Sequence, residues 1–180
     1  MKEQYTARLE LFADNAQRVK KAFAWQNAMV NRLAALLYTA ENKIADDGAI
    51  RESFELIKEN TGLFSSFRGT SAISIAALLS LSTDRQTQLA HTLAVYDMMK
   101  NAKFRASDYL VVAAYQIAAN TTSDQYLRTV ERVKAFYDGM KAHHRFLTGQ
   151  DDYIFAAMLG LSDIATFQAV WRAWSSSMLL

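Results

Sequence analysis

Two adjacent histidines and two adjacent aspartates are the residues of this sequence that most resemble a site for chemistry. His143 and His144 are separated from Asp151 and Asp152 by a short segment that contains Gly149. Imidazole nitrogens and carboxylate oxygens are common ligands of zinc and other metal ions, and the same groups act as general acids and bases. Such groups close together would suit a metal- or carboxylate-dependent hydrolase.

The spacing of these residues argues against a shared metal ion. Neighbouring residues on a helix point about 100° apart, so adjacent histidines seldom bind one ion together. A helical pair of metal ligands is usually spaced by four residues, as in the HExxH motif, which the sequence does not contain. We therefore predict no metal ion and no cofactor, and we retain four candidate metal ligands: His143, His144, Asp151 and Asp152.

The same stretch also fits the corner between two helices. The histidines fall where one helix is expected to end, and positive side chains are favourable there because a helix C-terminus carries partial negative charge. We expect Thr148 or Asp151 to cap the next helix by accepting hydrogen bonds from its first backbone N–H groups. In this interpretation Asp152 only adds a favourable negative charge to the helix N-terminus.

Two further aspartates are candidates for acid/base chemistry. Asp97 and Asp138 each follow a tyrosine within a predicted helix. A carboxylate in an apolar groove has a raised pKa and could act as a base. We favour ion pairs with Lys100 and Lys141, which lie three residues further along each helix.

A loop with small polar residues is a candidate anion site. Arg68, Thr70 and Ser71 precede the predicted N-terminus of a helix at residue 72. Backbone N–H groups at a helix N-terminus attract anions, but the same loop could simply cap the helix. The sequence contains no glycine-rich phosphate loop and no GxSxG motif, so it identifies no catalytic residue.

The composition excludes several classes of protein. The 180 residues include neither cysteine nor proline, and 51% are hydrophobic and 21% charged, as in ordinary globular proteins. A net charge of +2 argues against nucleic-acid binding, although basic residues beside aromatics leave a basic strip as an alternative. The sequence contains no run of about 18 apolar residues, so we predict no membrane span. The lack of cysteine suits a reducing compartment, so we expect a cytoplasmic protein.

Apolar residues recur at steps of three and four along most of the chain, which predicts helices. The first helix carries one apolar stripe over about six turns, from Tyr5 to Phe23. The segment 72–81 is apolar on nearly all sides and predicts a buried helix. We expect about nine helices in an all-α fold.

Three segments of the sequence are similar to one another, beginning at Phe54, Val95 and Phe136. Each contains a lysine, then an aromatic residue near the helix end, then an alanine pair in an apolar helix. The lysines are Lys58, Lys100 and Lys141, the aromatics are Phe64, Phe104 and Phe146, and the alanine pairs begin at Ala76, Ala113 and Ala156. A weaker copy includes Lys21 and the pair at Ala34. The three lysines are 42 and 41 residues apart. A period of this length predicts stacked antiparallel helix pairs, superhelix-like, with residues 1–180 forming a single domain of about four repeats.

Two stretches carry a resemblance to a known family. The run "FLTGQDDY", Phe146 to Tyr153, and the run "FSSFR", Phe64 to Arg68, are similar to an uncharacterised family of bacterial proteins, a domain of unknown function of the DUF4003 type. The resemblance covers most of the chain beyond about residue 50. It implies longer members with further helices, so that this chain would be a truncated form. It implies no activity, cofactor or catalytic residue.

Together these features favour an interaction protein over an enzyme. We expect a helical-repeat scaffold that binds a protein partner or a second copy of itself. The candidate interaction surface lies near the C-terminus and consists of Trp171, Trp174, Met178 and Leu179. The alternatives are a hydrolase with His143 and Asp151 at a repeat corner, and a nucleic-acid binder with a basic strip.

Overall fold

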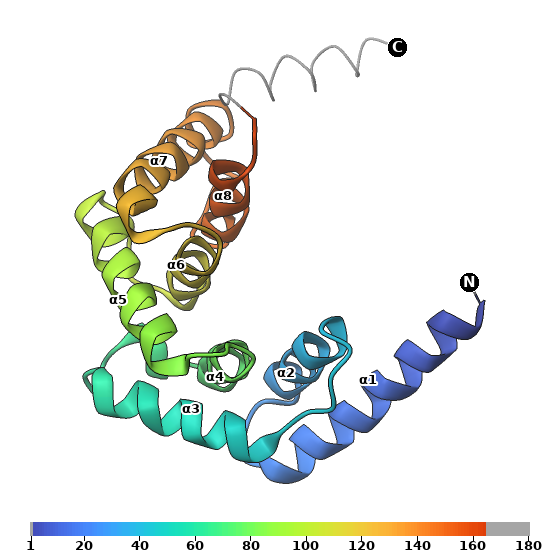
Figure 1. The fold of residues 1–180 in the computed structure, drawn as a ribbon. Helices are drawn as coiled ribbons and strands as arrows, with labels where there is room; N and C mark the ends of the chain where they lie inside the picture. The colour runs from blue at the N-terminus through green and yellow to red at the C-terminus, as the bar shows by residue number, and fades with distance from the viewer. Residues whose placement is uncertain (1, 165–180) are drawn as a thin grey trace. The chain divides into compact units, whose positions relative to one another are not determined.

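The computed structural model describes residues 2–164, and their side chains from residue 5 onward. Every regular element in this part of the chain is helical, which confirms the all-α prediction (Figure 1). The expected ninth helix lies almost entirely outside the described residues. The α-helices are α1 (Lys2–Ala22), α2 (Ala28–Ala40), α3 (Asp47–Asn60), α4 (Ala72–Ser80), α5 (Arg85–Asn101), α6 (Asp108–Asn120), α7 (Tyr126–His143) and α8 (Asp152–Leu161), with short 3-10 helices η1 (Ser66–Arg68) and η2 (Ser123–Gln125). None of the described helices is long and apolar enough to cross a membrane.

The chain forms two compact units, Met1–Thr87 and Gln88–Leu180. In the first unit α2 packs against both α1 and α4, and α3 packs against α4 (Figure 1). In the second unit α8 packs against both α6 and α7. The expectation of a single domain of four repeats concerns the whole chain and stays a prediction.

The second helix of each predicted pair is built around its alanines. The four pairs, Ala34-Ala35 in α2, Ala76-Ala77 in α4, Ala113-Ala114 in α6 and Ala156-Ala157 in α8, are all completely buried. The residue three positions before each pair is also buried, and these residues are Asn31, Ile73, Leu110 and Tyr153. Alanine side chains are small enough for helix backbones to approach closely, so these four Ala-pair helices can pack tightly against their neighbours.

The repeated lysines also occupy equivalent positions. Each ammonium lies over the ring of an aromatic residue four positions earlier on the same helix. The pairs and their distances to the ring centroid are Lys58 with Phe54 at 5.1 Å, Lys100 with Tyr96 at 5.8 Å, and Lys141 with Tyr137 at 5.8 Å. Cation–π attraction at an exposed site contributes about 0.5–1 kcal/mol. The repeat is therefore present in the contacts of these lysines as well as in their spacing along the sequence.

The aromatic residues at the helix ends are not equivalent. Phe104 is buried, whereas Phe64 and Phe146 are fully exposed. In the segment between α3 and α4, η1 turns Phe67 inward, and Phe67 is the residue that becomes buried. The loop before α4 is longer than the loop before α6, so the buried ring comes from a later position.

Candidate functional site

The histidine–aspartate stretch is a turn between α7 and α8. α7 ends at His143, and α8 begins at Asp152. The backbone carbonyl of His144 accepts hydrogen bonds from the N–H groups of Leu147 and Thr148 and from the Thr148 hydroxyl, at 2.9, 2.9 and 3.0 Å. These three bonds fold the chain back after α7, so this segment is the corner that the helix signals indicate.

The capping of α8 differs from the prediction. Asp151 occupies the N-cap position but makes no side-chain capping bond, and the Thr148 hydroxyl bonds back to His144. Asp151 has helical backbone angles, whereas a capping residue is usually extended. Asp152 instead accepts a 2.9 Å hydrogen bond from the N–H of Gly149. The carboxylate of Asp152 therefore stabilises the turn before the helix.

The four candidate metal ligands do not converge. Among the described residues no group of three or more histidine, cysteine, aspartate or glutamate side chains is placed to hold an ion. His143, His144 and Asp151 are exposed, and Asp152 is engaged by the turn. The hydrolase at this corner stays an untested hypothesis.

The two acid/base candidates on α5 and α7 lie on the surface. Both Asp97 and Asp138 are exposed. Asp138 pairs with Lys134, four residues earlier, at 2.5 Å, so the expected pairing with Lys141 is wrong. The ammonium of Lys141 lies over the Tyr137 ring instead. Because α7 carries lysines on both sides of Asp138, spacing alone could not decide between them.

The cation of the candidate anion site is turned toward another helix. The guanidinium of Arg68 donates to the carbonyls of Lys58 and Thr61, the latter at 2.6 Å, and to the Thr61 hydroxyl at 3.2 Å. These carbonyls lie at the C-terminal end of α3, which is partially negative, so Arg68 stabilises that helix end. Thr70 is exposed, and Ser71 stands at the N-cap of α4 without a side-chain capping bond. The anion site stays a prediction.

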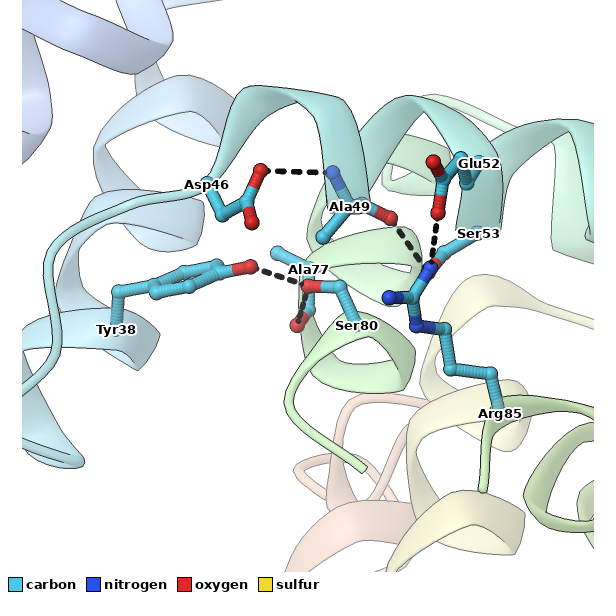
Figure 2. A network of polar contacts seen from close by, with 8 residues as sticks. All are labelled: Tyr38, Asp46, Ala49, Glu52, Ser53, Ala77, Ser80 and Arg85. Carbon is cyan, nitrogen blue, oxygen red and sulfur yellow. Dashed lines mark hydrogen bonds and ion pairs between the residues drawn. The ribbon is translucent and has the colours of Figure 1, made fainter. Parts of the chain in front are cut away.

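A polar network in the first unit links α2, α4 and α3 (Figure 2). The Tyr38 hydroxyl lies 2.6 Å from Oγ of Ser80, which itself donates to the carbonyl of Ala77 at 2.8 Å. Tyr38 is therefore the donor. Asp46 caps α3 by accepting from the N–H of Ala49 at 2.9 Å. Figure 2 also shows the ion pair between Glu52 on α3 and Arg85 in the first turn of α5, at 2.7 Å.

The electrostatics of this network suit packing rather than proton transfer. Burial raises the pKa of Tyr38, and the nearby Asp46 carboxylate raises it further, while Ser80 and Arg85 oppose the shift. A tyrosine with a raised pKa stays protonated near neutral pH, so it can donate a hydrogen bond but cannot serve as a base. The network thus fixes the Ala-pair helices α2 and α4 to each other.

The Ala-pair helices share a second feature, which the sequence interpretation missed. The residues one position before and two positions after the first alanine are large and apolar in every repeat, and we call these positions the apolar stripe. They are Leu33 and Leu36 in α2, Ile75 and Leu78 in α4, Val112 and Tyr115 in α6, and Phe155 and Met158 in α8. In the first and last repeats the stripe is exposed, at 46% and 52% in α2 and at 52% and 60% in α8. The sequence could have indicated this stripe, because the positions beside each alanine pair are apolar in all four repeats.

The stripe of α2 lies opposite its packed face. Met29, Leu33 and Leu36 are spaced by four and three residues, so they share one side of the helix. The opposite side carries buried Ala34 and Tyr38. An exposed helix face is usually polar, whereas α2 is apolar on both faces. Apolar residues on both faces are typical of a helix that is covered on both sides.

A groove runs beside this stripe between α1 and α2. It has a volume of about 220 Å³. Its lining residues are Ala16, Gln17 and Lys20 from α1, and Ala28, Asn31 and Arg32 from α2. Two of these side chains are cationic and none is a carboxylate. Asn31 is buried and donates to the carbonyl of Phe23 at 3.0 Å, while its Oδ1 has no hydrogen-bond partner.

A comparison with known protein families assigns the chain to one of them. The family model described as "Protein of unknown function (DUF4003)" matches residues 15–170. The chain belongs to the DUF4003 family. The match includes both runs on which the resemblance was based, and it extends further toward the N-terminus than residue 50. No curated protein and no solved structure matched the chain.

The DUF4003 assignment includes the helices that carry the apolar stripe, α2, α4, α6 and α8, in full. The family description names no activity, so it assigns no site residue. The candidate interaction residues Trp171, Trp174, Met178 and Leu179 lie outside the described residues.

The first helix of this DUF4003 chain adds to the exposed apolar surface. Val19 and Phe23 at its C-terminal end are buried, whereas Tyr5 and Leu9 near its N-terminal end are each 68% exposed. α1 has 21 residues and its neighbour α2 has 13, so α1 extends beyond α2 (Figure 1). The apolar side of α1 is therefore covered along only part of its length.

Proposed function

We propose that this DUF4003 protein is a helical-repeat interaction module that binds a helical segment of a protein partner or of a second copy. The observation that carries the proposal is the apolar stripe beside the alanine pairs. Leu33 and Leu36 are exposed at the same repeat positions as Phe155 and Met158. Exposed apolar patches of this kind mark interaction surfaces in soluble proteins.

The spacing of the stripe favours a helix as the bound element. Positions separated by three and four residues form a ridge along a helix, and such a ridge packs into the groove of another helix. Recognition of an amphipathic helix uses anchors at this spacing. The described residues contain no strand, so the addition of an extended peptide to a sheet edge has no template there.

The small apolar area of the α2 stripe limits how tightly a partner can bind to it. Complete burial of a leucine contributes about 1.5–3 kcal/mol, and Leu33 and Leu36 are only about half exposed, so covering both contributes about 1.5–3 kcal/mol. A dissociation constant of 1 mM already corresponds to about 4 kcal/mol. A partner that binds usefully must therefore contact more than one stripe or add polar contacts.

The test uses a photocrosslinking amino acid at position 36 and, as a control, at the exposed Arg128 of α7. A protein that crosslinks at position 36 but not at position 128 is purified, and its affinity is measured for the wild type and for Leu33→Asp/Leu36→Asp. We expect at least a tenfold loss of affinity in the double variant. Equal crosslinking at both positions, or equal affinity of both proteins, would contradict the proposal.

The same preparation tests the remaining expectations. Light scattering over a range of concentrations reports whether the partner is a second copy of the chain. Binding to a random duplex at low salt tests the nucleic-acid alternative, and a thermal shift with divalent ions tests the hydrolase. We also propose a cytoplasmic location in a bacterial cell, supported by the lack of cysteine, which cell fractionation would test.

A further inference from the structure

The charged side chains of α2 and of the groove beside its stripe are all basic. Met29, Leu33 and Leu36 form the apolar ridge, and Arg32 is the single charged residue of α2. Lys20 of α1 lines the groove beside the ridge together with Arg32. Both are exposed, and the groove contains no carboxylate to neutralise them.

We infer that the partner of the α2 stripe is an amphipathic helix with acidic residues along one edge of its apolar face. The inference rests on the proposed function and specifies the chemistry of the partner. The apolar face of such a helix would cover Leu33 and Leu36, and its acidic edge would lie over Lys20 and Arg32. Complementary charge at the rim of an apolar contact selects partners and orients them.

The charges argue against a second copy as the occupant. In an antiparallel contact between two α2 stripes, neither helix would supply a carboxylate for the Arg32 of the other, because α2 contains no acidic residue. Like charges facing each other oppose association. An acidic helix removes this repulsion.

The buried Asn31 adds an independent feature of the same groove. Its Nδ2 is used by the carbonyl of Phe23, so the amide orientation is fixed and Oδ1 remains without a partner. Buried polar atoms usually have a hydrogen-bond partner. A small rearrangement at the groove would allow a donor from the bound helix, such as a serine hydroxyl, to reach this oxygen.

The experiment compares two labelled synthetic helices with the same leucine face, one with glutamate and one with lysine beside that face. Fluorescence anisotropy measures their binding to the full chain at low salt. We expect the glutamate peptide to bind at least tenfold more tightly, and its advantage to shrink at high salt because screening weakens exposed charge pairs. The double variant Lys20→Glu/Arg32→Glu should reverse the preference.

A matched control makes the same change of net charge elsewhere. Lys103→Glu/Arg128→Glu replaces two exposed basic residues of the second unit and should leave the preference for the glutamate peptide unchanged. Equal binding of the two peptides, absence of binding, or a preference that survives Lys20→Glu/Arg32→Glu would overturn the inference.

Leu33→Asp/Leu36→Asp separates this inference from the proposed function. If both peptides bind equally and both lose affinity in this variant, the stripe is a docking surface but the acidic partner is wrong. If the glutamate peptide binds this variant as tightly as the wild type, both proposals fail.

Discussion

The hydroxyl of Tyr38 donates a 2.6 Å hydrogen bond to Oγ of Ser80, and the two residues are 42 positions apart. Each lies four residues after the first alanine of its pair, at Ala34 and Ala76. The bond therefore joins equivalent positions of consecutive repeats. The corresponding positions of the second unit are Ile117 and Gly160, which have no hydroxyl and cannot form such a bond.

Removal of the Tyr38 hydroxyl should weaken the first unit. In Tyr38→Phe the bond from Tyr38 to Ser80 is lost, while the Ser80 hydroxyl keeps its bond to Ala77. We expect the free energy of unfolding to fall by about 0.5–1.5 kcal/mol in urea denaturation. The half-exposed Tyr109→Phe is the control. An equal effect of both substitutions would show that the bond between repeats does not contribute.

Stability should fall in alkaline solution because of Tyr137. Burial and the adjacent Tyr153 raise the pKa of Tyr137 to about 12. An unfolded tyrosine loses its proton near pH 10, so the folded state binds more protons between pH 10 and 12. Its stabilising contribution is complete below pH 10 and is lost as the pH rises toward 12, by up to about 1.4 kcal/mol per pH unit.

The substitution Tyr137→Phe should flatten this decline, and Tyr109→Phe should not. Urea denaturation at several pH values between 9 and 12 gives the slopes. The same slope for Tyr137→Phe and the wild type would contradict the assignment.

Enlargement of an alanine pair should destabilise the second unit. Ala114 in α6 is completely buried, so a leucine there would force helices apart at a cost of about 1–3 kcal/mol. Ala119 is exposed on the same helix, and Ala119→Leu should change stability by less than about 0.5 kcal/mol. Thermal unfolding compares the two variants, and a small effect of Ala114→Leu would mean that α6 is not tightly packed.

A glycine in α8 makes a similar close contact. A methyl group at Gly160 would clash with Cγ2 of Val133 and lie 3.2 Å from its backbone atoms. We expect Gly160→Ala to cost about 1–3 kcal/mol, and Val133→Ala to restore part of the loss in the double variant. Gly62→Ala is the control, because nothing lies within 4 Å of its added methyl group. Gly62→Ala should be neutral or stabilising by about 0.4–1 kcal/mol.

The sequence predicts the helices and the repeat because both depend on local periodicity. The alanine pairs recur at a fixed spacing, and only small side chains fit where helix backbones approach. The exposure of Leu33 and Leu36 could not be predicted in this way, since an apolar face is normally assigned to the core. The role of Arg68 also depends on tertiary structure, because the loop after α3 must fold before its side chain can reach the carbonyl of Thr61.

Single cysteines test the apolar stripe most directly, since the chain has none of its own. Leu36→Cys and Met158→Cys place a thiol on the stripe, and Ala35→Cys and Ala157→Cys place one at the adjacent buried alanines. Reaction with a thiol reagent measures access. We predict that both stripe cysteines react at least about 100-fold faster than their buried neighbours, because a buried thiol reacts only when the structure opens. Equal rates at positions 35 and 36, or at 157 and 158, would contradict an exposed apolar surface on the Ala-pair helices.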